Sequence, residues 1–474
     1  MRILFLNPPF KHRISRDSRW PERTKSGTLY YPFWLAYAAG LAMREHEVLL
    51  IDAVAKGLDF RRTKREIEKF SPDLLVMETT TPTVMSDFNF VNYIGDLNAK
   101  ILMVGSHVSA LPEWTLKSCK RVDFVARGEF DYTVMDLAKN LERPEKVKGI
   151  SFRRGRRIIH TPDREPIKDL DSLPFVSRVY EKFLNLRDYG YSLARKPLVQ
   201  IFSSRGCPNR CVFCQLPQTF SGRLFRVRSP ENFVDEMEYI ADNMGVEEVF
   251  IEDDTFTIDK PRVRKICRLM IKRKLKVIWS ANVRADVDLE TMKLMKKAGA
   301  RLLVVGYESG SQKVLNTIKK GITINMSRKF AKNAKKVGLR VFGCWMIGLP
   351  GDTKESILET WKLAKELDSD MVFFQQAVPF PGTEMYEWAK RNGYLVTEDF
   401  SKWLDENGRL GFLLSYPWLS AEEIRYWRDK LMRSFYFSPK YLLKTLVRNM
   451  EPHEMVRVLR SAKEFLSFLF REAK

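Results

Sequence analysis

The chain has 474 residues, of which 45% are hydrophobic and 12% aromatic, so it encodes a folded protein with more than one core. Its formal net charge of +22 fits a basic solvated surface, attraction to anionic lipid, or nucleic acid, but no recognition motif supports nucleic acid. Six cysteines are too few for a disulfide scaffold. The chain has no apolar run of about 18 residues and no signal peptide, so we expect a cytoplasmic protein, with membrane association as an alternative.

Residues 1–148 alternate short apolar runs with helical patterns such as 33–44 and 63–69. Buried strands separated by helices predict an α/β domain with a parallel, doubly wound, Rossmann-like sheet. The expected strands are Arg2–Asn7, Glu47–Asp52, Leu74–Glu78, Ile101–Gly105 and Phe124–Arg127. Ligands of such sheets bind at the carboxyl ends of the strands, where the residues here are small or polar. The candidates at this rim are Pro8, Thr80, Gly105, His107 and Gly128.

A linker is expected over residues 149–195, with a hairpin over Ser151–Thr161 that turns near Gly155. From 196 to 390 the alternation of strands and helices returns, and six β units predict a partial (βα)6 barrel. Its expected strands are Val199–Ser203, Glu248–Glu252, Val277–Ala281, Leu302–Tyr307, Arg340–Met346 and Met371–Ala377. Residues 391–474 form a C-terminal helical region, with helices expected over 420–434 and 439–474.

Three closely spaced cysteines follow the first expected barrel strand. Cys207, Cys211 and Cys214 form a C-x3-C-x2-C triplet with no fourth cysteine nearby. Thiolates are soft ligands that suit iron–sulfur clusters, and three of them would leave one iron of a [4Fe–4S] cluster open to a small molecule. The alternatives are a zinc knuckle without a clear fourth ligand and three structural cysteines. The remaining cysteines, Cys119, Cys267 and Cys344, are scattered, so we expect no second cluster.

The triplet, with Phe213 before its last cysteine, resembles the radical S-adenosylmethionine superfamily. Further matching segments lie at later strand ends: Phe250–Phe256, Gly306-Tyr307-Glu308-Ser309-Gly310, Met346–Gly351 and Pro379–Tyr386. The resemblance implies that the open iron binds the amino and carboxylate groups of S-adenosylmethionine, and that the cofactor is cleaved reductively to an adenosyl radical. It also supplies candidate cofactor contacts, which are Phe213, Glu308, Ser309, Ile347 and Gly348.

Polar residues at two further strand ends are also candidates. Asp253 and Asp254 could receive hydrogen bonds from ribose hydroxyls or orient a substrate, although acids at strand ends are often helix caps. Asn282 and Arg284 end the third barrel strand, and Arg284 is a candidate partner for the methionyl carboxylate, with a surface salt bridge as the alternative.

The N-terminal domain resembles the vitamin B12-binding domain that precedes such barrels, on Asn7-Pro8-Pro9, Thr79–Pro82, Val104–Pro112 and Asp123–Glu129. Cobalamin is therefore an expected cofactor, alongside the alternative that the domain keeps the fold without the corrinoid. No histidine fits the D-x-H-x-x-G pattern, so we expect no histidine ligand to cobalt, and His107 is expected to line the site instead.

Within this branch, the chain is similar to hopanoid-biosynthesis-associated radical enzymes. The matching strings are Asp123–Phe130 with Tyr132-Thr133, Leu173–Val176, Arg226–Glu231, Asp253–Thr257, and Leu302–Gly310 continuing to Ile318–Gly321. The main functional hypothesis is therefore modification of unactivated carbon in a lipid or its headgroup. The alternatives are a cobalamin-dependent C-methyltransferase and a non-enzymatic cluster or corrinoid sensor. The expected partners are a small-molecule or lipid substrate and a reducing protein such as flavodoxin or ferredoxin, with no nucleic acid. The aromatic and basic stretch Phe435–Lys444 suggests peripheral membrane contact or a helix packed over the barrel.

Overall fold

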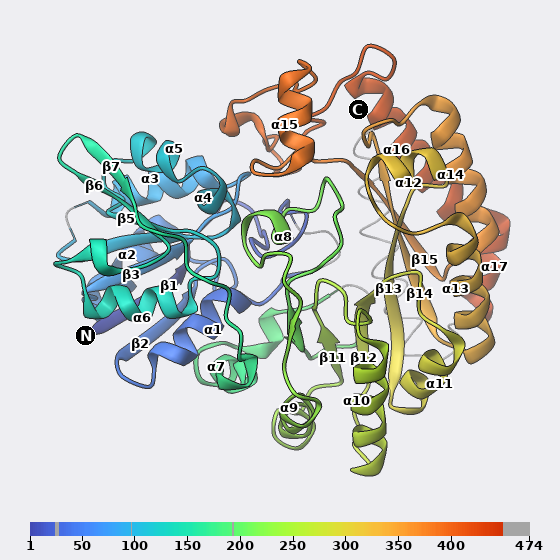
Figure 1. Ribbon diagram of the computed structural model, residues 1–474, viewed down its shortest axis with the longest axis horizontal. Coiled ribbons are helices and arrows are strands. Elements are labelled where there is room, and N and C mark those ends of the chain that lie inside the picture. The colour runs from blue at the N-terminus through green and yellow to red at the C-terminus, as the bar shows by residue number, and fades with distance from the viewer. Residues whose placement is uncertain (24–27, 96, 192–193, 449–474) are drawn as a thin grey trace.

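The computed structural model describes residues 1–23, 28–95, 97–191 and 194–448. It has an N-terminal lobe and a barrel lobe, each built on its own sheet (Figure 1). The short helix α8 (Leu216–Thr219) lies between the two lobes, and α15 (Glu384–Arg391) lies above it in this view. Among the described residues, no helix is long and apolar enough to cross a membrane.

The first sheet has the strand order β2-β1-β3-β4-β5-β6-β7, and its first five strands are parallel, which confirms the doubly wound prediction. The strands are β1 (Arg2–Asn7), β2 (Glu47–Asp52), β3 (Leu74–Glu78), β4 (Lys100–Val104), β5 (Phe124–Ala126), β6 (Ile150–Arg154) and β7 (Arg157–His160). The predicted hairpin exists, but β6 pairs with β5, so assigning it to a linker was wrong: it extends this sheet.

Side chains alternate across β1, and both faces of the sheet are covered by helices. Ile3 and Phe5 pack in one cluster with α1 (Phe33–Ala42), whereas Leu4 and Leu6 pack in another with residues of α2 (Phe60–Phe70) and α3 (Val84–Ile94). The remaining helices of this lobe and of the segment that leaves it are α4 (Ser106–Ala110), α5 (Pro112–Ser118), α6 (Asp131–Lys139) and α7 (Val176–Phe183).

The second sheet is the predicted partial barrel. Its six strands are all parallel, in the order β15-β14-β13-β12-β11-β8. They are β8 (Leu198–Ile201), β11 (Glu248–Ile251), β12 (Trp279–Val283), β13 (Ala300–Glu308), β14 (Arg340–Ile347) and β15 (Met371–Gln376). A small antiparallel pair, β9 (Ser204–Arg205) with β10 (Arg226–Val227), brackets the cysteine triplet.

Most of the helices between the barrel strands begin at a side-chain cap, such as Ser229, Asp259, Asp288, Thr323 and Thr353, whereas Ser311 does not cap the short helix over Gln312–Thr317. They are α9 (Pro230–Asn243), α10 (Lys260–Lys272), α11 (Leu289–Lys297), α12 (Gln312–Thr317), α13 (Ile324–Val337) and α14 (Lys354–Leu367). Because each helix returns the chain to the same edge of the sheet, the carboxyl ends of all six strands face one side.

The C-terminal region contains α16 (Ala421–Tyr436) and α17 (Pro439–Arg448), after a largely irregular stretch from 392 to 420. The part of the predicted last helix beyond Arg448 lies outside the described residues. Tyr436 donates a hydrogen bond to the carbonyl of Val372 at 2.6 Å, and Lys444 donates one to that of Asp368 at 2.7 Å. The basic aromatic stretch therefore packs on the barrel through part of its length, although Phe437, Leu442 and Leu443 are exposed.

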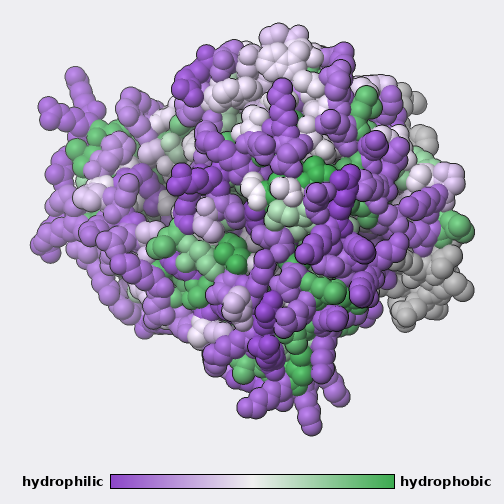
Figure 2. All heavy atoms as spheres, turned by 45° about the vertical axis from the view of Figure 1, so that its right-hand side comes forward, coloured by the Kyte–Doolittle hydropathy of each residue, from purple (hydrophilic) through white to green (hydrophobic). Residues whose placement is uncertain are grey.

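Figure 2 shows one face of the molecule, on which hydrophilic side chains predominate and hydrophobic ones gather in several separate patches. Such a face agrees with the high content of charged residues, which is 30%.

Two buried bidentate ion pairs join the lobes beside the cysteine triplet. Arg205, on β9, binds both carboxylate oxygens of Asp131 at 2.8 and 3.1 Å. Arg226, on β10, binds both oxygens of Glu129 at 2.7 and 2.8 Å. All four side chains are at most 5% exposed. Water therefore screens these pairs little, and removal of one partner would leave an uncompensated buried charge.

We predict that Asp131→Asn destabilises the protein by roughly 3–5 kcal/mol, because the buried guanidinium of Arg205 loses its bidentate partner. Only Glu129 then remains near it, at 3.9 Å, and Glu129 already pairs with Arg226. Denaturant unfolding of the purified protein measures this change. Glu366→Gln, which breaks the half-exposed pair with Arg328, is the matched control and should have a much smaller effect. Equal losses of stability in the two variants would contradict a special role for the pairs between the lobes.

Candidate active site

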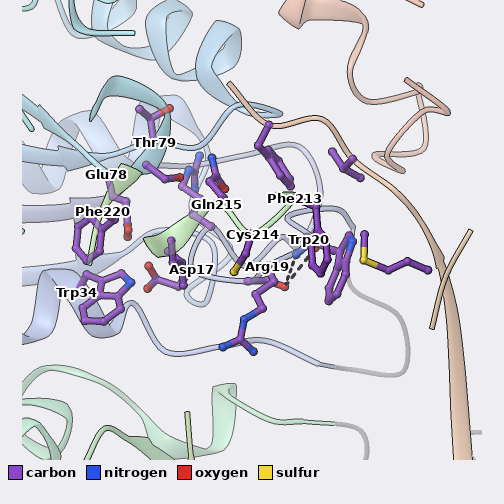
Figure 3. A pocket seen from close by; sticks show the side chains of 18 residues that line it. Asp17, Arg19, Trp20, Trp34, Glu78, Thr79, Phe213, Cys214, Gln215 and Phe220 are labelled. Atoms are coloured by element: carbon purple, nitrogen blue, oxygen red, sulfur yellow. Dashed lines mark hydrogen bonds between the residues drawn. The ribbon is translucent and has the colours of Figure 1, made fainter. Parts of the chain in front are cut away.

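A cavity lies where the two lobes meet, between the first sheet and the cysteine loop (Figure 3). One wall comes from the N-terminal lobe: Arg16, Asp17, Ser18, Arg19, Trp20, Trp34, Glu78, Thr79, Gly105 and Ser106. The other comes from the cysteine loop and the ends of β14 and β15: Phe213, Cys214, Gln215, Leu216, Phe220, Met346, Val378 and Phe380. The cavity thus joins the carboxyl ends of both sheets.

Topology explains the position of this cavity. Strand order reverses at β1, because β2 lies on one side of it and β3 on the other. The loops after β1 and β3 therefore diverge and leave a crevice, which is where ligands bind in open α/β sheets. Gly105, after β4, has φ +115°, and a Cβ there would lie 2.4 Å from the carbonyl oxygen of Thr79. Only glycine lets these two strand ends approach so closely at the crevice.

The cysteine loop is fixed by backbone contacts to distant parts of the barrel. The amide of Val212 donates to the carbonyl of Ile318 at 3.1 Å, and its own carbonyl accepts from the amide of Met385 at 3.0 Å. Gln218 donates to the carbonyl of Cys214 at 2.8 Å. These bonds hold the loop between the fourth and sixth barrel strands, so the positions of its thiols are set by the fold.

All three predicted ligands lie in this pinned loop. Cys207 and Cys211 are buried, whereas Cys214 is partly exposed and faces the cavity. Burial raises the pKa of Cys211 and that of Cys214, because it disfavours the thiolate. Binding to a metal would offset this penalty, since the bound form is the thiolate.

Within the described residues, no three His, Cys, Asp or Glu side chains are gathered tightly enough to hold one metal ion. Ligands of a cluster bind different iron atoms and so lie farther apart than ligands of a single ion. Three thiols on one loop, open to a cavity at Cys214, fit the donor set of a cluster. The ligand roles of Cys207, Cys211 and Cys214 remain predictions.

A buried ion pair lies near Cys211. The ammonium of Lys320 binds Glu308 at 2.7 Å, and Glu308 takes a φ of +64° at an irregularity between β13 and β14. Burial alone would lower the pKa of Lys320, but Glu308 and Cys211 raise it above its usual value. Lys320 was not among the predicted site residues, because a lysine in a Lys-Lys-Gly turn gives no sign of burial.

Arg284 donates to the carbonyls of Lys320 and Gly321 at 3.0 and 3.1 Å. Its guanidinium therefore ties two strand-end loops together near Cys211. To bind a methionyl carboxylate as predicted, the guanidinium of Arg284 would either keep these two hydrogen bonds and use its remaining N–H groups, or give them up.

The predicted Ile347 is the last residue of β14, and the predicted Gly348 begins the tightly bonded turn that follows it. Asp352 accepts hydrogen bonds from the amides of Gly348 and Leu349 at 2.9 and 3.1 Å, and burial raises its pKa to about 6. A Cβ at Gly348 would lie 2.8 Å from Ile424 of α16. Ser309 lies 3.2 Å from the hydroxyl of Thr360. None of Gly348, Ile347 and Ser309 lines the cavity.

Asp253 and Asp254 differ in what they contact. Asp253 is fully buried and accepts hydrogen bonds from the amides and hydroxyls of Ser203 and Ser204 at 2.6 to 3.1 Å. It therefore ties β11 to the start of the cysteine loop. Asp254 faces Arg19 at 3.5 Å. Asn282 donates to Glu252 at 3.4 Å and to the carbonyl of Asp253 at 3.3 Å.

Of the five rim candidates, only Gly105 lines the cavity. His107 lies instead behind it, bonded through Nδ1 to Thr81 at 2.9 Å and packed against Trp114 and Phe400. Burial lowers its pKa to about 3, so it is neutral. The expectation that His107 lines the site was wrong, because α4 turns its side chain into the core.

Pro8, Thr80 and Gly128 shape the loops around the crevice. The carbonyl of Pro8 accepts a hydrogen bond from Arg16, the carbonyl of Thr80 accepts one from the amide of Thr83, and the amide of Gly128 donates to Ser109. All three lie close to the rim without lining the cavity.

Residues 16–20, which form part of the cavity wall, could not be predicted as site residues, because this stretch is irregular and its sequence has no period. Glu78 did carry a signal: it is the one charged residue of an otherwise apolar expected strand, LLVME. A charge at the end of a buried strand often marks a site.

We predict that Cys207→Ser, Cys211→Ser and Cys214→Ser each remove most of the iron and sulfide after anaerobic reconstitution, because serine is a poor cluster ligand. Chemical analysis of iron and visible absorbance measure the loss. Cys267→Ser, a buried cysteine on α10, is the control and should keep the full iron content. Full iron in any triplet variant would contradict the assignment of these ligands.

Comparison with known proteins agrees with this geometry. Residues 201–364 match the model of the radical SAM superfamily. Over 452 residues the chain is 32% identical to an uncharacterized methyltransferase of Pyrococcus horikoshii, covering 94% of this chain and 95% of that protein. It is 26% identical over 402 residues to an anaerobic magnesium-protoporphyrin IX monomethyl ester cyclase of Rubrivivax gelatinosus, covering 82% of this chain and 70% of the cyclase.

Among solved structures, the radical S-adenosylmethionine methyltransferase TsrM from Kitasatospora setae, with cobalamin and a [4Fe–4S] cluster bound, has the same fold. The TM-score is 0.73 at 17% identity, covering 100% of this chain and 99% of TsrM. The family match includes the cysteine loop and the barrel strands β11, β12, β13 and β14, and the similarity to the Pyrococcus protein extends over both lobes. The chain therefore belongs to the radical SAM superfamily and is an enzyme.

Proposed function

We propose that the protein is a cobalamin-dependent radical SAM methyltransferase that transfers a methyl group to carbon of a small-molecule substrate. The observation that carries this proposal is the cavity that joins the strand-end crevice of the first sheet to Cys214. A corrinoid in that crevice would lie next to the open iron of a cluster on the triplet. Bound cobalamin would supply the methyl group, and the cluster would supply the electron that cleaves S-adenosylmethionine.

The chain's own residues have definable tasks in this scheme. The triplet would hold the cluster, and Phe213 would pack beside the cofactor at the cavity wall. The charges of Lys320, Glu308 and Arg284 surround Cys211, so they would set the electrostatic environment of the cluster. The aromatic side chains of Trp20, Trp34 and Phe220, which line the cavity from both lobes, would exclude water from the radical.

The relatives support this function in part. The Pyrococcus protein and TsrM are both named as methyltransferases, whereas the Rubrivivax protein is named as a cyclase. Cyclisation without methyl transfer is therefore the second candidate. These names give no support to a lipid substrate or to hopanoid-type remodelling. A reducing protein and a small-molecule substrate are the partners we propose.

The methyltransferase and cyclase functions can be distinguished by the products formed from S-adenosylmethionine, even when the substrate is unknown. We predict that reconstituted, reduced protein forms S-adenosylhomocysteine only when hydroxocobalamin is supplied, because methyl transfer to the corrinoid removes the methyl group from the sulfonium. Liquid chromatography with mass spectrometry measures this product and 5′-deoxyadenosine. Formation of 5′-deoxyadenosine alone, at a rate that does not depend on hydroxocobalamin, would contradict the methyltransferase proposal and favour the cyclase-type reaction.

A further inference from the structure

Two carboxyl groups of the cavity wall have few hydrogen-bond donors around them. Neither oxygen of Asp17 nor Oε2 of Glu78 meets a donor in good hydrogen-bond geometry among the described residues, and all three atoms are shielded from solvent. The two acids contact each other, so one proton can be shared between them. Glu78, at the end of β3, is 3% exposed. Figure 3 shows both carboxyl groups in the part of the cavity near Trp34 and Phe220. Buried polar groups are normally satisfied within the fold, so these are exceptions that need an explanation.

The nearest cation does not satisfy the pair. Arg16 faces Glu78, but its guanidinium binds Asp87 at 2.6 Å and also donates to Asn7 at 2.7 Å. Asp52, also nearby, adds a second negative charge rather than a donor. Burial raises the pKa of Asp17 and that of Glu78, and mutual repulsion raises that of Asp17 further. The ligand-free fold therefore carries an unfavourable free energy at this point.

The opposite wall carries an unpartnered donor. Nε2 of Gln215, in the residue after Cys214, is buried and has no hydrogen-bond partner within the described residues. The cavity thus presents carboxyl acceptors on the N-terminal lobe and an amide donor on the cysteine loop. A primary carboxamide matches this pattern, since its NH2 group donates and its carbonyl accepts.

We propose that Asp17 and Glu78 accept hydrogen bonds from primary carboxamide groups of a ligand in this cavity, and that Gln215 donates to a carboxamide carbonyl. This inference rests on the proposed function, because a corrinoid ring carries carboxamide side chains around its edge. The three residues would position the ring in the crevice and select amidated corrinoids over forms without amides. They take no part in bond making.

We predict that substitution of either acid lowers the affinity for a corrinoid and raises the stability of the ligand-free protein. Asp17→Asn and Glu78→Gln should each weaken binding of cobinamide by about 10-fold or more, because a hydrogen bond to a charged or strong acceptor is lost. The same variants should unfold at a higher denaturant concentration at pH 8 without ligand, because each removes one of two buried acids that repel each other. A residue with only a structural role would lose stability when it is replaced.

A matched pair of ligands tests selectivity. Cobinamide keeps the carboxamides but lacks the nucleotide tail, and heptamethyl cobyrinate also lacks the tail but carries methyl esters instead of amides. Wild-type protein should bind cobinamide more tightly than heptamethyl cobyrinate. The ratio of the two dissociation constants should be smaller in each of the variants Asp17→Asn, Glu78→Gln and Gln215→Met. Glu113→Gln, on exposed α5, is the control and should change neither affinity nor preference.

The outcomes separate this inference from the proposed function. If wild-type protein binds neither corrinoid in equilibrium titrations followed by absorbance, the proposed function fails and this inference fails with it. If wild-type protein binds cobinamide but Asp17→Asn and Glu78→Gln bind it equally well, only the inference is overturned. Lower stability of both ligand-free variants would likewise overturn it, since the carboxyl groups would then be satisfied within the fold.

Discussion

The site depends on the two buried ion pairs that lock the cysteine loop to the rim of the N-terminal sheet. Arg205 and Arg226 lie on the short strands that bracket the triplet, and their carboxylate partners Asp131 and Glu129 follow β5. Arg205 also lies over the rings of Trp34 and Tyr37 at 5.0 and 4.9 Å. Burying four charges is expensive, and hydrophobic residues could pack the lobes together as well. Bidentate pairs, however, add a fixed orientation, which a reaction between groups on two lobes requires.

The position of the cavity follows from two general rules about where α/β folds bind ligands. Open α/β sheets bind ligands where strand order reverses, and barrels carry chemistry at strand carboxyl ends. In this enzyme the two edges face each other, so Gly105 and Glu78 from one sheet share a cavity with Cys214 and Met346 from the other lobe. Some polar atoms inside the cavity have no hydrogen-bond partner within the fold. Such atoms are expected where a ligand binds, because the ligand can supply the missing partners.

Much of the fold could be predicted from the sequence because strands and helices have periods. Runs such as LLVME predict buried strands, and C-x3-C-x2-C carries its chemistry in its spacing. The cavity wall could not be predicted, because Asp17 and Arg19 lie in irregular chain, where no period links a residue to its surroundings. The ion pairs between the lobes were hidden for another reason: their partners are 74 and 97 positions apart. His107 was misplaced because its residue type suits a ligand site, whereas the direction of its side chain is set by α4.

The central claim is that corrinoid and cluster lie on opposite sides of one cavity. Electron paramagnetic resonance of reconstituted protein, with cobalt reduced to Co(II) and the cluster to its paramagnetic state, tests it most directly. We expect magnetic interaction between the two centres, seen as broadened or split signals that revert to simple spectra when either centre is absent. Spectra of the doubly loaded protein that equal the sum of the separate centres would contradict it.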